Sequence, residues 1–235
     1  MKRILEPEVM ESNQEAISFD SYQKNTMKRW WPFLEKKLKK LRILKGSKIL
    51  DVVAGPANFS IRLAKKYKTR VWATDLSNEM LKIARYNIKK SKINKYVSLL
   101  KDDAKKMRFR DNSFDFVFCR YTLHQIPHPE KVVNEILRVA KKGGKIFILD
   151  AVRPRSKKEL EKRVKSSEKG YKKSKIKGWE TLLKNSKESA LSSLSKKEIE
   201  NLFRASKIKK YKLKFQDFLN KKGRPRLFIL IGEKT

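Results

Sequence analysis

Short apolar runs alternate with amphipathic stretches along most of the chain. The run at 49–53 stops at the small-residue turn 54–57 (Ala-Gly-Pro-Ala), which is how a strand buried on both faces ends. Apolar positions then recur at helical spacing over 59–67, and a second apolar run at 71–73 leads to Asp75. The pattern predicts a strand, a tight turn, a helix and a second strand, joined as a right-handed crossover between parallel strands.

The same alternation continues toward the C-terminus. Asn58, Ser77 and Ser195 are available as helix caps, Ser195 as part of a capping box. Pro129 suits the first turn of another helix, which Gly143-Gly144 is expected to stop. Further strands are predicted at 97–100, 114–119, 146–149, 208–218 and 227–231, with a Lys-Lys-Gly-Arg-Pro turn between the last two. Strands that alternate with helices predict an α/β fold with a mostly parallel sheet.

A candidate ligand site lies at the carboxyl ends of the first two strands, where sheets of this kind form their ligand crevice. Asp75, at the tip of the second strand, can accept hydrogen bonds from both hydroxyls of a ribose, and small residues in the first turn let the backbone approach closely. These features indicate a nucleoside-containing cofactor. A glycine at the end of a buried strand also arises for steric reasons alone.

Three neighbouring residues suit an adenine ring. Leu76 and Met80 would give the ring apolar cover, although core packing alone also explains them. Asp103, just beyond the third strand, can accept a hydrogen bond from an exocyclic amine, and it equally suits a turn position.

The chain divides into four parts by composition. Residues 1–45 are predicted to form an N-terminal helical cover of two pieces, the second interrupted or started near Pro32. Residues 46–152 form the cofactor-binding core. Residues 153–194 form a mobile basic insertion with a helical second half, which we expect to cover the substrate, and residues 195–235 complete the sheet.

Length and charge set further limits. At 235 residues and 39% hydrophobic content the chain can bury a substantial core, and no apolar run approaches the ~20 residues that span a bilayer. Lys and Arg number 61 against 25 Asp and Glu, a net charge of +36 that would attract nucleic acid or any polyanion. A-rich coding or a thermophilic history also enriches lysine, although thermophilic surfaces are rich in Glu too. The excess is spread along the whole chain and marks no single docking patch.

Cysteine and histidine usage argues against metal chemistry. Cys119 is the single cysteine, which excludes an intrachain disulfide and any multi-cysteine metal site and points to the cytosol. With His124 and His128 as the two histidines, no dedicated zinc site is expected. The stretch 1–14 is acidic and polar after two basic residues, so it does not read as a signal peptide. We therefore expect a cytoplasmic protein without a metal site.

In their order along the chain, five motifs resemble those of the class I S-adenosylmethionine-dependent methyltransferases, most closely the ubiquinone/menaquinone-biosynthesis-type branch. They are ILDVVAGPA, VWATDLSNEML, DDA, FDFVFCRYTLHQI and EILRVAKKGGKIFI. The resemblance covers roughly residues 40–152 and continues more weakly over 194–232. It implies a doubly wound, seven-stranded, mostly parallel Rossmann-like sheet with one antiparallel strand near the C-terminus, and S-adenosyl-L-methionine as cofactor.

The resemblance also implies contacts in the first turn. Asp51, Gly55 and Ala57 would line the methionine side of the cofactor, together with Val53 and Ala54 of the same turn. The family prefers glycine or alanine where this chain has Val53, and glycine where it has Ala57. A β-branched residue is expected to crowd the turn unless its side chain points into the sheet.

The remaining implied contacts follow the later strands. Asp75 takes the ribose hydroxyls, while Leu76 and Met80 cover adenine. Asp103 and Ala104 would touch the adenine edge, and Arg120 would begin the segment under the transferred methyl group. Tyr22 would close over the cofactor.

Methyl transfer from a sulfonium is an in-line displacement that depends chiefly on positioning and exclusion of water, and it needs a base only if the acceptor must lose a proton. His124 and Tyr121, in the segment after the fourth strand, are the candidate catalytic residues, with pocket shaping and packing as their alternatives. This segment lacks the Asn/Asp-Pro-Pro-Tyr pattern that holds a planar nitrogen. The lack argues against N6-adenine-type chemistry and leaves O-, C- and other N-acceptors open.

The leading hypothesis is an enzyme that methylates a small molecule. One alternative is an RNA- or protein-directed methyltransferase that uses its basic surface, which co-purified nucleic acid would favour. The other is a non-catalytic methyltransferase-like domain that binds cofactor or a partner, which a lack of cofactor binding would favour.

Overall fold

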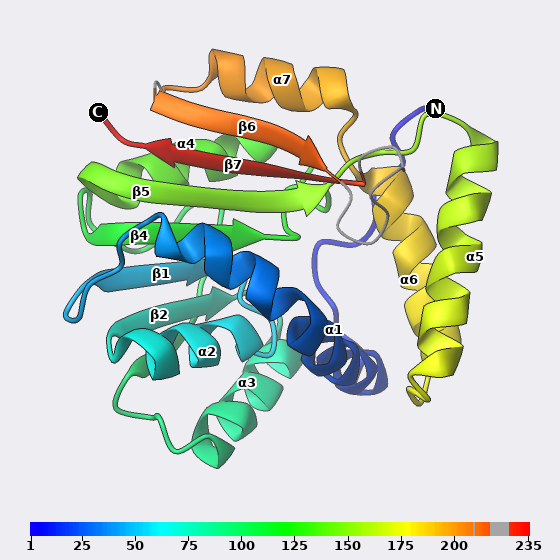
Figure 1. The fold of residues 1–235 in the computed structure, drawn as a ribbon, viewed down its shortest axis with the longest axis horizontal. Helices are drawn as coiled ribbons and strands as arrows, with labels where there is room; N and C mark the ends of the chain where they lie inside the picture. The colour runs from blue at the N-terminus through cyan, green and yellow to red at the C-terminus, as the bar shows by residue number, and fades with distance from the viewer. Residues whose placement is uncertain (209, 217–225) are drawn as a thin grey trace.

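In the part of the chain that the structure describes, seven strands form one sheet in the spatial order β3-β2-β1-β4-β5-β7-β6 (Figure 1). The structure is a computed structural model that describes residues 1–208, 210–216 and 226–235. The strands are β1 Lys48–Val52, β2 Arg70–Asp75, β3 Val97–Lys101, β4 Phe114–Arg120, β5 Ala140–Ala151, β6 Lys210–Gln216 and β7 Leu227–Glu233. β7 runs antiparallel to β5 and β6, and the other neighbouring pairs are parallel. The predicted doubly wound, mostly parallel sheet is confirmed.

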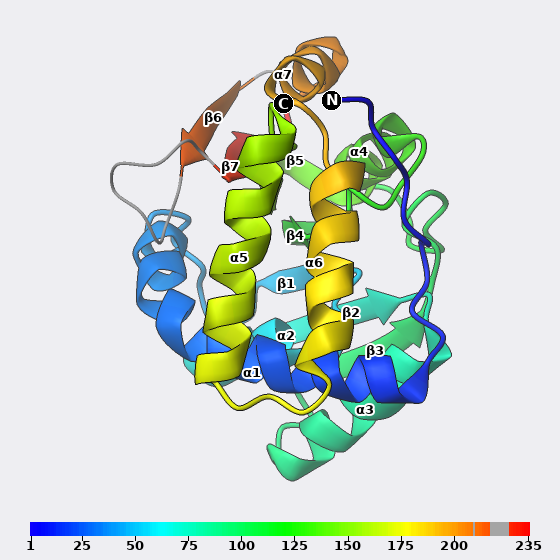
Figure 2. The same cartoon turned by 90° about the vertical axis from the view of Figure 1, so that its right-hand side faces the viewer.

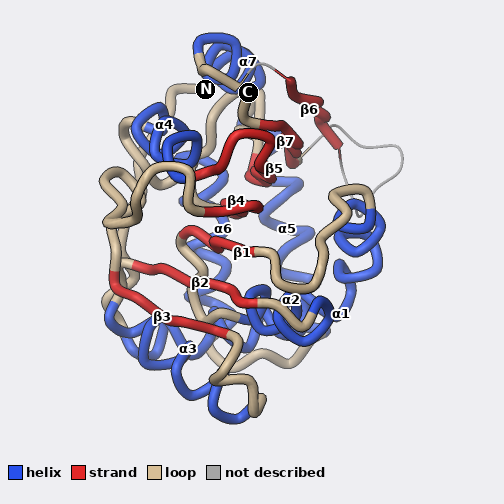
Figure 3. The backbone as a smooth tube through the Cα atoms, turned by 90° about the vertical axis from the view of Figure 1, so that its left-hand side faces the viewer, coloured by secondary structure: helices blue, strands red, loops and turns tan. Residues whose placement is uncertain are grey.

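Helices cover both faces of this sheet. They are α1 Asn13–Lys39, α2 Asn58–Tyr67, α3 Asn78–Lys90, α4 Pro129–Val139, α5 Lys157–Lys173, α6 Trp179–Ser192 and α7 Lys196–Ala205. Side chains of α1, α2 and α3 share one hydrophobic cluster with Phe116 and Phe118 of β4, whereas α4 and α7 share a second cluster with Val117 and Cys119. The alternation along β4 therefore sends successive side chains into opposite cores, and α1 and α4 lie on opposite sides of the sheet (Figure 3).

α5 and α6 lie side by side across the carboxyl ends of the parallel strands (Figure 2). The sequence predicted that only the second half of this segment is helical, and the structure corrects this. Ser156 caps α5 by accepting a hydrogen bond from the backbone N–H of Glu159. Ion pairs one turn apart, Glu159 with Arg163 and Glu168 with Lys172, support the helix further. A polar helix of this kind forms with few apolar residues because only a narrow stripe of it is buried.

α1 is one helix of 27 residues with Pro32 inside it, where the sequence predicted two pieces. A proline in a helix interior costs about 3 kcal/mol or more, because it removes a hydrogen bond and crowds the preceding turn. Met27, Leu34 and Leu38 are buried on both sides of it, and each buried side chain of this size stabilises by about 1.5–3 kcal/mol. Burial along the whole helix therefore outweighs the local cost.

The two glycines at 143 and 144 lie inside β5 and do not stop α4, contrary to the prediction. α4 ends at Val139, and β5 begins at the next residue. Gly143 has a φ of +73°, and a Cβ on Gly144 would lie 2.7 Å from the carbonyl oxygen of Lys141. Both glycines are thus required by a bend within the strand, where the pairing of β4 with β5 shifts register.

The last two predicted strands form as β6 and β7. The predicted turn at 221–225 and residues 217–218 lie outside the described residues. Among the helices that the structure describes, none combines the length and the apolarity needed to cross a membrane.

Candidate active site

The turn between β1 and α2 contains three residues with a left-handed backbone. The φ angles are +52° at Val53, +57° at Gly55 and +58° at Ala57. Glycine adopts such a φ freely, whereas a residue with a side chain pays roughly 1–2 kcal/mol. The Val53 side chain packs against the hydrophobic cluster that the sheet shares with α4 and α7. It therefore does not crowd the turn. Ala57 occupies the N-cap position of α2, which corrects the prediction that Asn58 does.

Asp75 ends β2 and faces this turn. Its Oδ2 accepts the backbone N–H of Gly55 at 2.8 Å, and its Oδ1 accepts that of Ser77 at 3.0 Å. Burial raises the pKa of the Asp75 carboxyl, and the backbone hydrogen bonds oppose that rise. A carboxylate has about four acceptor sites, so Asp75 keeps acceptor capacity for the hydroxyls of a ribose.

The turn after β3 lies against the end of β2. The backbone N–H of Asp102 donates to the carbonyl oxygen of Asp75 at 3.1 Å. Asp103 is half-buried, and its Oδ1 accepts the backbone N–H of Lys105 at 2.8 Å, while Ala104 is buried. The structure therefore brings Asp103 and Ala104 to the same edge as Asp75.

The start of α3 completes that edge. Ser77 caps α3, because its Oγ accepts the backbone N–H of Met80 at 3.1 Å. Met80 is buried and Leu76 half-buried, as side chains that cover an adenine ring would be. The Ser77 hydroxyl also donates to the carbonyl oxygen of Met10 at 2.5 Å, which ties the N-terminal segment to this helix end.

Asp51 and Arg120 form a buried pair between β1 and β4. Arg120 Nη2 lies 3.8 Å from Asp51 Oδ2, and Ser60 Oγ donates to the same oxygen at 2.5 Å. The guanidinium of Arg120 lies 3.8 Å from the ring centroid of Phe59. Burial raises the pKa of Asp51 and lowers that of Arg120, and each charge opposes the shift of the other. Asp51 Oδ1 and Arg120 Nε have no hydrogen-bond partner among the described residues. Such a pair fits a ligand that carries both an amino group and a carboxylate.

His124 lies between two carboxylates. Its Nδ1 is 2.6 Å from Asp150 Oδ1, and its Nε2 is 2.9 Å from Glu6 Oε1. Burial alone would lower the pKa of His124, but the two carboxylates outweigh it and raise the pKa to about 10. In this arrangement the ring is an imidazolium that holds the segment after β4 in place. The predicted catalytic role would require the Glu6 contact to open.

Aromatic side chains of α1 contact both Tyr121, the first residue after β4, and Tyr171 of α5. The ring centroids of Tyr121 and Trp30 of α1 are 6.3 Å apart. Tyr22, also on α1, packs edge-on against Tyr171 of α5 with 5.2 Å between centroids. Burial, with a contribution from nearby Tyr22, raises the pKa of Tyr121 well above its usual value, so its hydroxyl stays protonated at neutral pH. Tyr22 therefore lies where the predicted cover meets the predicted catalytic segment.

Sequence reasoning missed the polar cluster that ties α1 to the cofactor turn. Asp20 Oδ1 accepts from Asn58 Nδ2 at 2.8 Å and from Asn87 Nδ2 at 3.0 Å, and Asn87 also donates to the carbonyl oxygen of Pro56. Asp20 pairs with Lys24 as well. In the sequence, Asp20 and Lys24 look like an ordinary surface pair one turn apart, so no local signal marks Asp20 as inward-facing.

The segment at residues 1–12, here called the strap, was also missed. The Arg3 guanidinium donates to four carbonyl oxygens, three after β4 and one at the end of α6. Glu6 contacts His124, and Glu8 pairs with Lys105 beside Asp103. The strap thereby connects the segment after β4, the cover and the turn after β3, all through contacts that are distant in sequence.

These residues fit S-adenosylmethionine at both of its ends. Asp75 has acceptor capacity for a ribose, and the unpartnered atoms of Asp51 and Arg120 match the amino and carboxylate groups of a methionine. Gly55, which donates to Asp75, lies close to Met80, since a Cβ on Gly55 would be 3.9 Å from the Met80 sulfur.

The chain is similar to known methyltransferases. Residues 43–218 match the family model described as methyltransferase domain. The chain is 34% identical to a demethylmenaquinone methyltransferase of Listeria welshimeri over 119 residues, which make up 50% of each chain. It is 33% identical to one of Anoxybacillus flavithermus over 144 residues, 59% of this chain and 56% of the relative. The chain thus spans about half the length of the curated relatives it matches.

Solved structures share the fold across nearly the whole chain. A SAM-dependent methyltransferase from Aquifex aeolicus is similar with a TM-score of 0.61 and 22% identity, covering 86% of this chain and 89% of that chain. A putative S-adenosyl-L-methionine-dependent methyltransferase from Methanococcus maripaludis is similar with a TM-score of 0.68 and 19% identity, covering 96% and 95%. With the family match over most of its length and the strand order of that fold, the chain belongs to the class I S-adenosylmethionine-dependent methyltransferases.

Proposed function

We propose that this chain transfers a methyl group from S-adenosylmethionine to a small-molecule acceptor. The observation that carries the proposal is the arrangement of Asp75 against Gly55, next to the unpartnered buried atoms of Asp51 and Arg120. The first pair suits the nucleoside end of the cofactor and the second suits its amino-acid end. Membership of the methyltransferase family supports the same function.

The chain's own contribution is chiefly positional. When bound, the cofactor supplies a methyl group that the sulfonium charge has already activated. Asp75 would fix one end of it, while Asp51 and Arg120 fix the other, which places the reacting carbon beside the segment after β4. Holding donor and acceptor in line and excluding water then supplies most of the rate enhancement. Tyr121, as a neutral phenol, can donate a hydrogen bond to the acceptor.

The cover supports an acceptor with a planar ring. On α1, Trp30 packs against Tyr121, the first residue after β4, and Tyr22 packs against Tyr171 of α5. Each favourable aromatic contact contributes about 0.5–1.5 kcal/mol beyond burial of area. The similar curated proteins are named demethylmenaquinone methyltransferases, which also supports a small-molecule acceptor for this chain.

Titration calorimetry with S-adenosylmethionine and its demethylated product tests the proposal. We expect both to bind saturably to the full chain and Asp75→Ala to weaken binding at least tenfold, because hydrogen bonds to a charged group contribute about 1.5–3 kcal/mol each. Asp111→Ala is the matched control. It removes an exposed carboxylate that lies just before the amino end of β4, whereas the candidate site lies at the carboxyl ends of the strands.

Two results would contradict the proposal. One is that neither compound binds to the folded wild-type chain, which would favour a non-catalytic domain. The other is that Asp75→Ala, shown to be folded by circular dichroism, binds as tightly as Asp111→Ala.

A further inference from the structure

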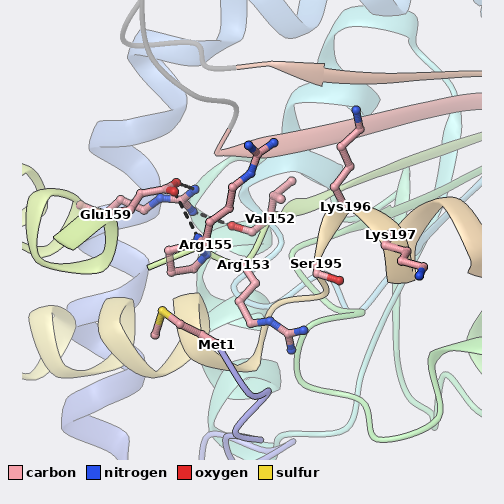
Figure 4. A pocket seen from close by; sticks show the side chains of 10 residues that line it. Met1, Val152, Arg153, Arg155, Glu159, Ser195, Lys196 and Lys197 are labelled. Atoms are coloured by element: carbon pink, nitrogen blue, oxygen red, sulfur yellow. Dashed lines mark hydrogen bonds and ion pairs between the residues drawn. The ribbon is translucent and has the colours of Figure 1, made fainter. Parts of the chain in front are cut away.

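A basic pocket of about 300 Å³ lies between the loop after β5 and the first turn of α7. Met1 of the strap and several residues of the cover line it, but none of its lining residues is among those proposed to contact the cofactor or the acceptor. Figure 4 shows the residues of the loop after β5 on one side and those of the first turn of α7 on the other. The charged lining residues are five cations and one carboxylate: Arg153, Arg155, Arg163, Lys196, Lys197 and Glu159.

Arg153 is the best indicator of a ligand. Its side chain is only 8% exposed, and its Nη2 donates to Glu198 Oε2 at 2.7 Å. Its Nη1 has no hydrogen-bond partner among the described residues. A buried guanidinium N–H without an acceptor is unfavourable, so a ligand oxygen that reached it would be bound there.

The surroundings of Arg153 favour an anion. Arg163 is also buried and is held at the pocket wall by the carbonyl oxygen of Val152. Arg155 and Lys197 are exposed, and no carboxylate of the described chain lies within ion-pair distance of either. The pocket also lies at the beginning of α7, where the helix dipole is positive.

Arginine content separates this pocket from the rest of the surface. Lysines far outnumber arginines in the chain, yet three arginines of the pocket lie within residues 153–163. The planar guanidinium fork matches phosphate oxygens two at a time, which an ammonium group cannot do. A volume near 300 Å³ is at the lower end for ligand pockets and suits a small compound.

We propose that this pocket binds the phosphate group of a small phosphorylated ligand. The site is separate from the proposed methyl transfer, and its test requires neither S-adenosylmethionine nor an acceptor. A nucleic-acid strand would present the same phosphate chemistry, so the experiment has one arm for each source.

The first arm titrates the full chain with inorganic pyrophosphate at constant ionic strength. We expect saturable binding with one site per chain, and about a tenfold loss of affinity in Arg155→Gln and in Lys197→Gln. Lys165→Gln removes the same charge from an exposed position on α5 outside the pocket and should change affinity less than twofold. Arg153→Lys keeps the charge but removes the fork, and it should weaken binding at least fivefold.

The second arm uses a single-stranded oligonucleotide. For a small-ligand pocket, the Arg155→Gln/Lys197→Gln double variant should bind the oligonucleotide within twofold of the wild type. An equal loss of oligonucleotide and pyrophosphate affinity would assign the phosphate to a nucleic-acid strand and overturn the small-ligand proposal.

Two other results would also overturn it. One is that the folded wild type shows no saturable pyrophosphate binding. The other is that Lys165→Gln weakens binding as much as the pocket variants, which would mean that net charge alone attracts the anion. If Arg153→Lys fails to fold, the exposed positions Arg155 and Lys197 still decide the question.

Discussion

A histidine acts as a base only when one ring nitrogen is free, and His124 has both nitrogens engaged. Asp150 also accepts the backbone N–H groups of Thr122 and His124 at 3.0 and 3.2 Å, so it fixes the chain as well as the ring. The sequence singles out His124 as the titratable group of this segment. The sequence gives no sign that Glu6, near the N-terminus, contacts the second ring nitrogen of His124.

The protonation of His124 is directly observable. We predict that its imidazole is still charged at pH 8 in a ¹⁵N NMR spectrum, where the exposed His128 provides a second, reference signal. Glu6→Gln should lower the pKa of His124, because it replaces a carboxylate with a neutral amide. Glu11→Gln, at an exposed position before α1, should leave the signal unchanged. A neutral His124 in the wild type at pH 8 would contradict the assignment.

The same pKa makes stability depend on pH. Because the folded-state pKa of about 10 lies above the usual value of 6.5, the contribution of His124 is complete below pH 6.5 and is lost as the pH rises toward 10. From urea unfolding, we expect the free energy of unfolding to fall between pH 6.5 and 9 by up to about 1.4 kcal/mol per pH unit. His124→Gln should lack this slope. Equal slopes in the two proteins would be evidence against the raised pKa.

At the scale of elements, the docking of α1 decides the shape of the cofactor turn. Asp20 joins α1 to Asn58 at the start of α2 and to Asn87 in α3. Asn87 in turn holds the carbonyl oxygen of Pro56 within the turn. A helix outside the β1–α2 unit therefore fixes the backbone of the candidate cofactor turn.

We predict that Asp20→Ala lowers the free energy of unfolding by about 3 kcal/mol and also weakens S-adenosylmethionine binding. The substitution leaves the buried amides of Asn58 and Asn87 without their acceptor, and each hydrogen bond to a charged group contributes about 1.5–3 kcal/mol. Glu11→Ala, which removes an exposed carboxylate from the strap, is the control for stability. Denaturant unfolding compares the two. Similar free energies for both variants would show that the cluster does not hold α1.

Elements that depend on local signals could be predicted from the sequence. Ser77 and Ser195 cap their helices, and Pro129 opens another, because these interactions join residues within one turn. The continuity of α1 through Pro32 and the bend at Gly143 could not be predicted. Both depend on burial and strand pairing against elements that are distant along the chain.

At the scale of the molecule, the strand order explains why the sequence can suggest part of the candidate site. Neighbouring strands β2, β1 and β4 place Asp75, Asp51 and Arg120 at one end of the sheet. The position of Asp75 at a strand end marks it as a candidate, whereas the roles of Asp51 and Arg120 follow from the resemblance to the methyltransferase family. The contacts of the strap and of the cover could not be predicted in this way. The strap and the aromatic contacts of α5 depend on how separate segments pack, which no local pattern encodes.

The net charge of +36 affects the whole molecule. Like charges repel across the surface, and salt screens this repulsion, with a Debye length of about 10 Å at 0.1 M. We therefore expect the melting temperature to rise by about 3 °C or more when NaCl is raised from about 20 to about 300 mM, as measured by calorimetry. A melting temperature that falls with salt would mean that attractive ion pairs outweigh the repulsion.

The central claim is that a nucleoside cofactor lies across the ends of β1 and β2 with its sulfur facing the aromatic cover. A crystal structure with S-adenosylhomocysteine bound tests it most directly. We predict Asp75 within hydrogen-bond distance of the ribose hydroxyls, the amino-acid end against Asp51 and Arg120, and the sulfur directed toward Tyr121. A ribose bound away from Asp75, or a sulfur directed away from the segment after β4, would contradict the account.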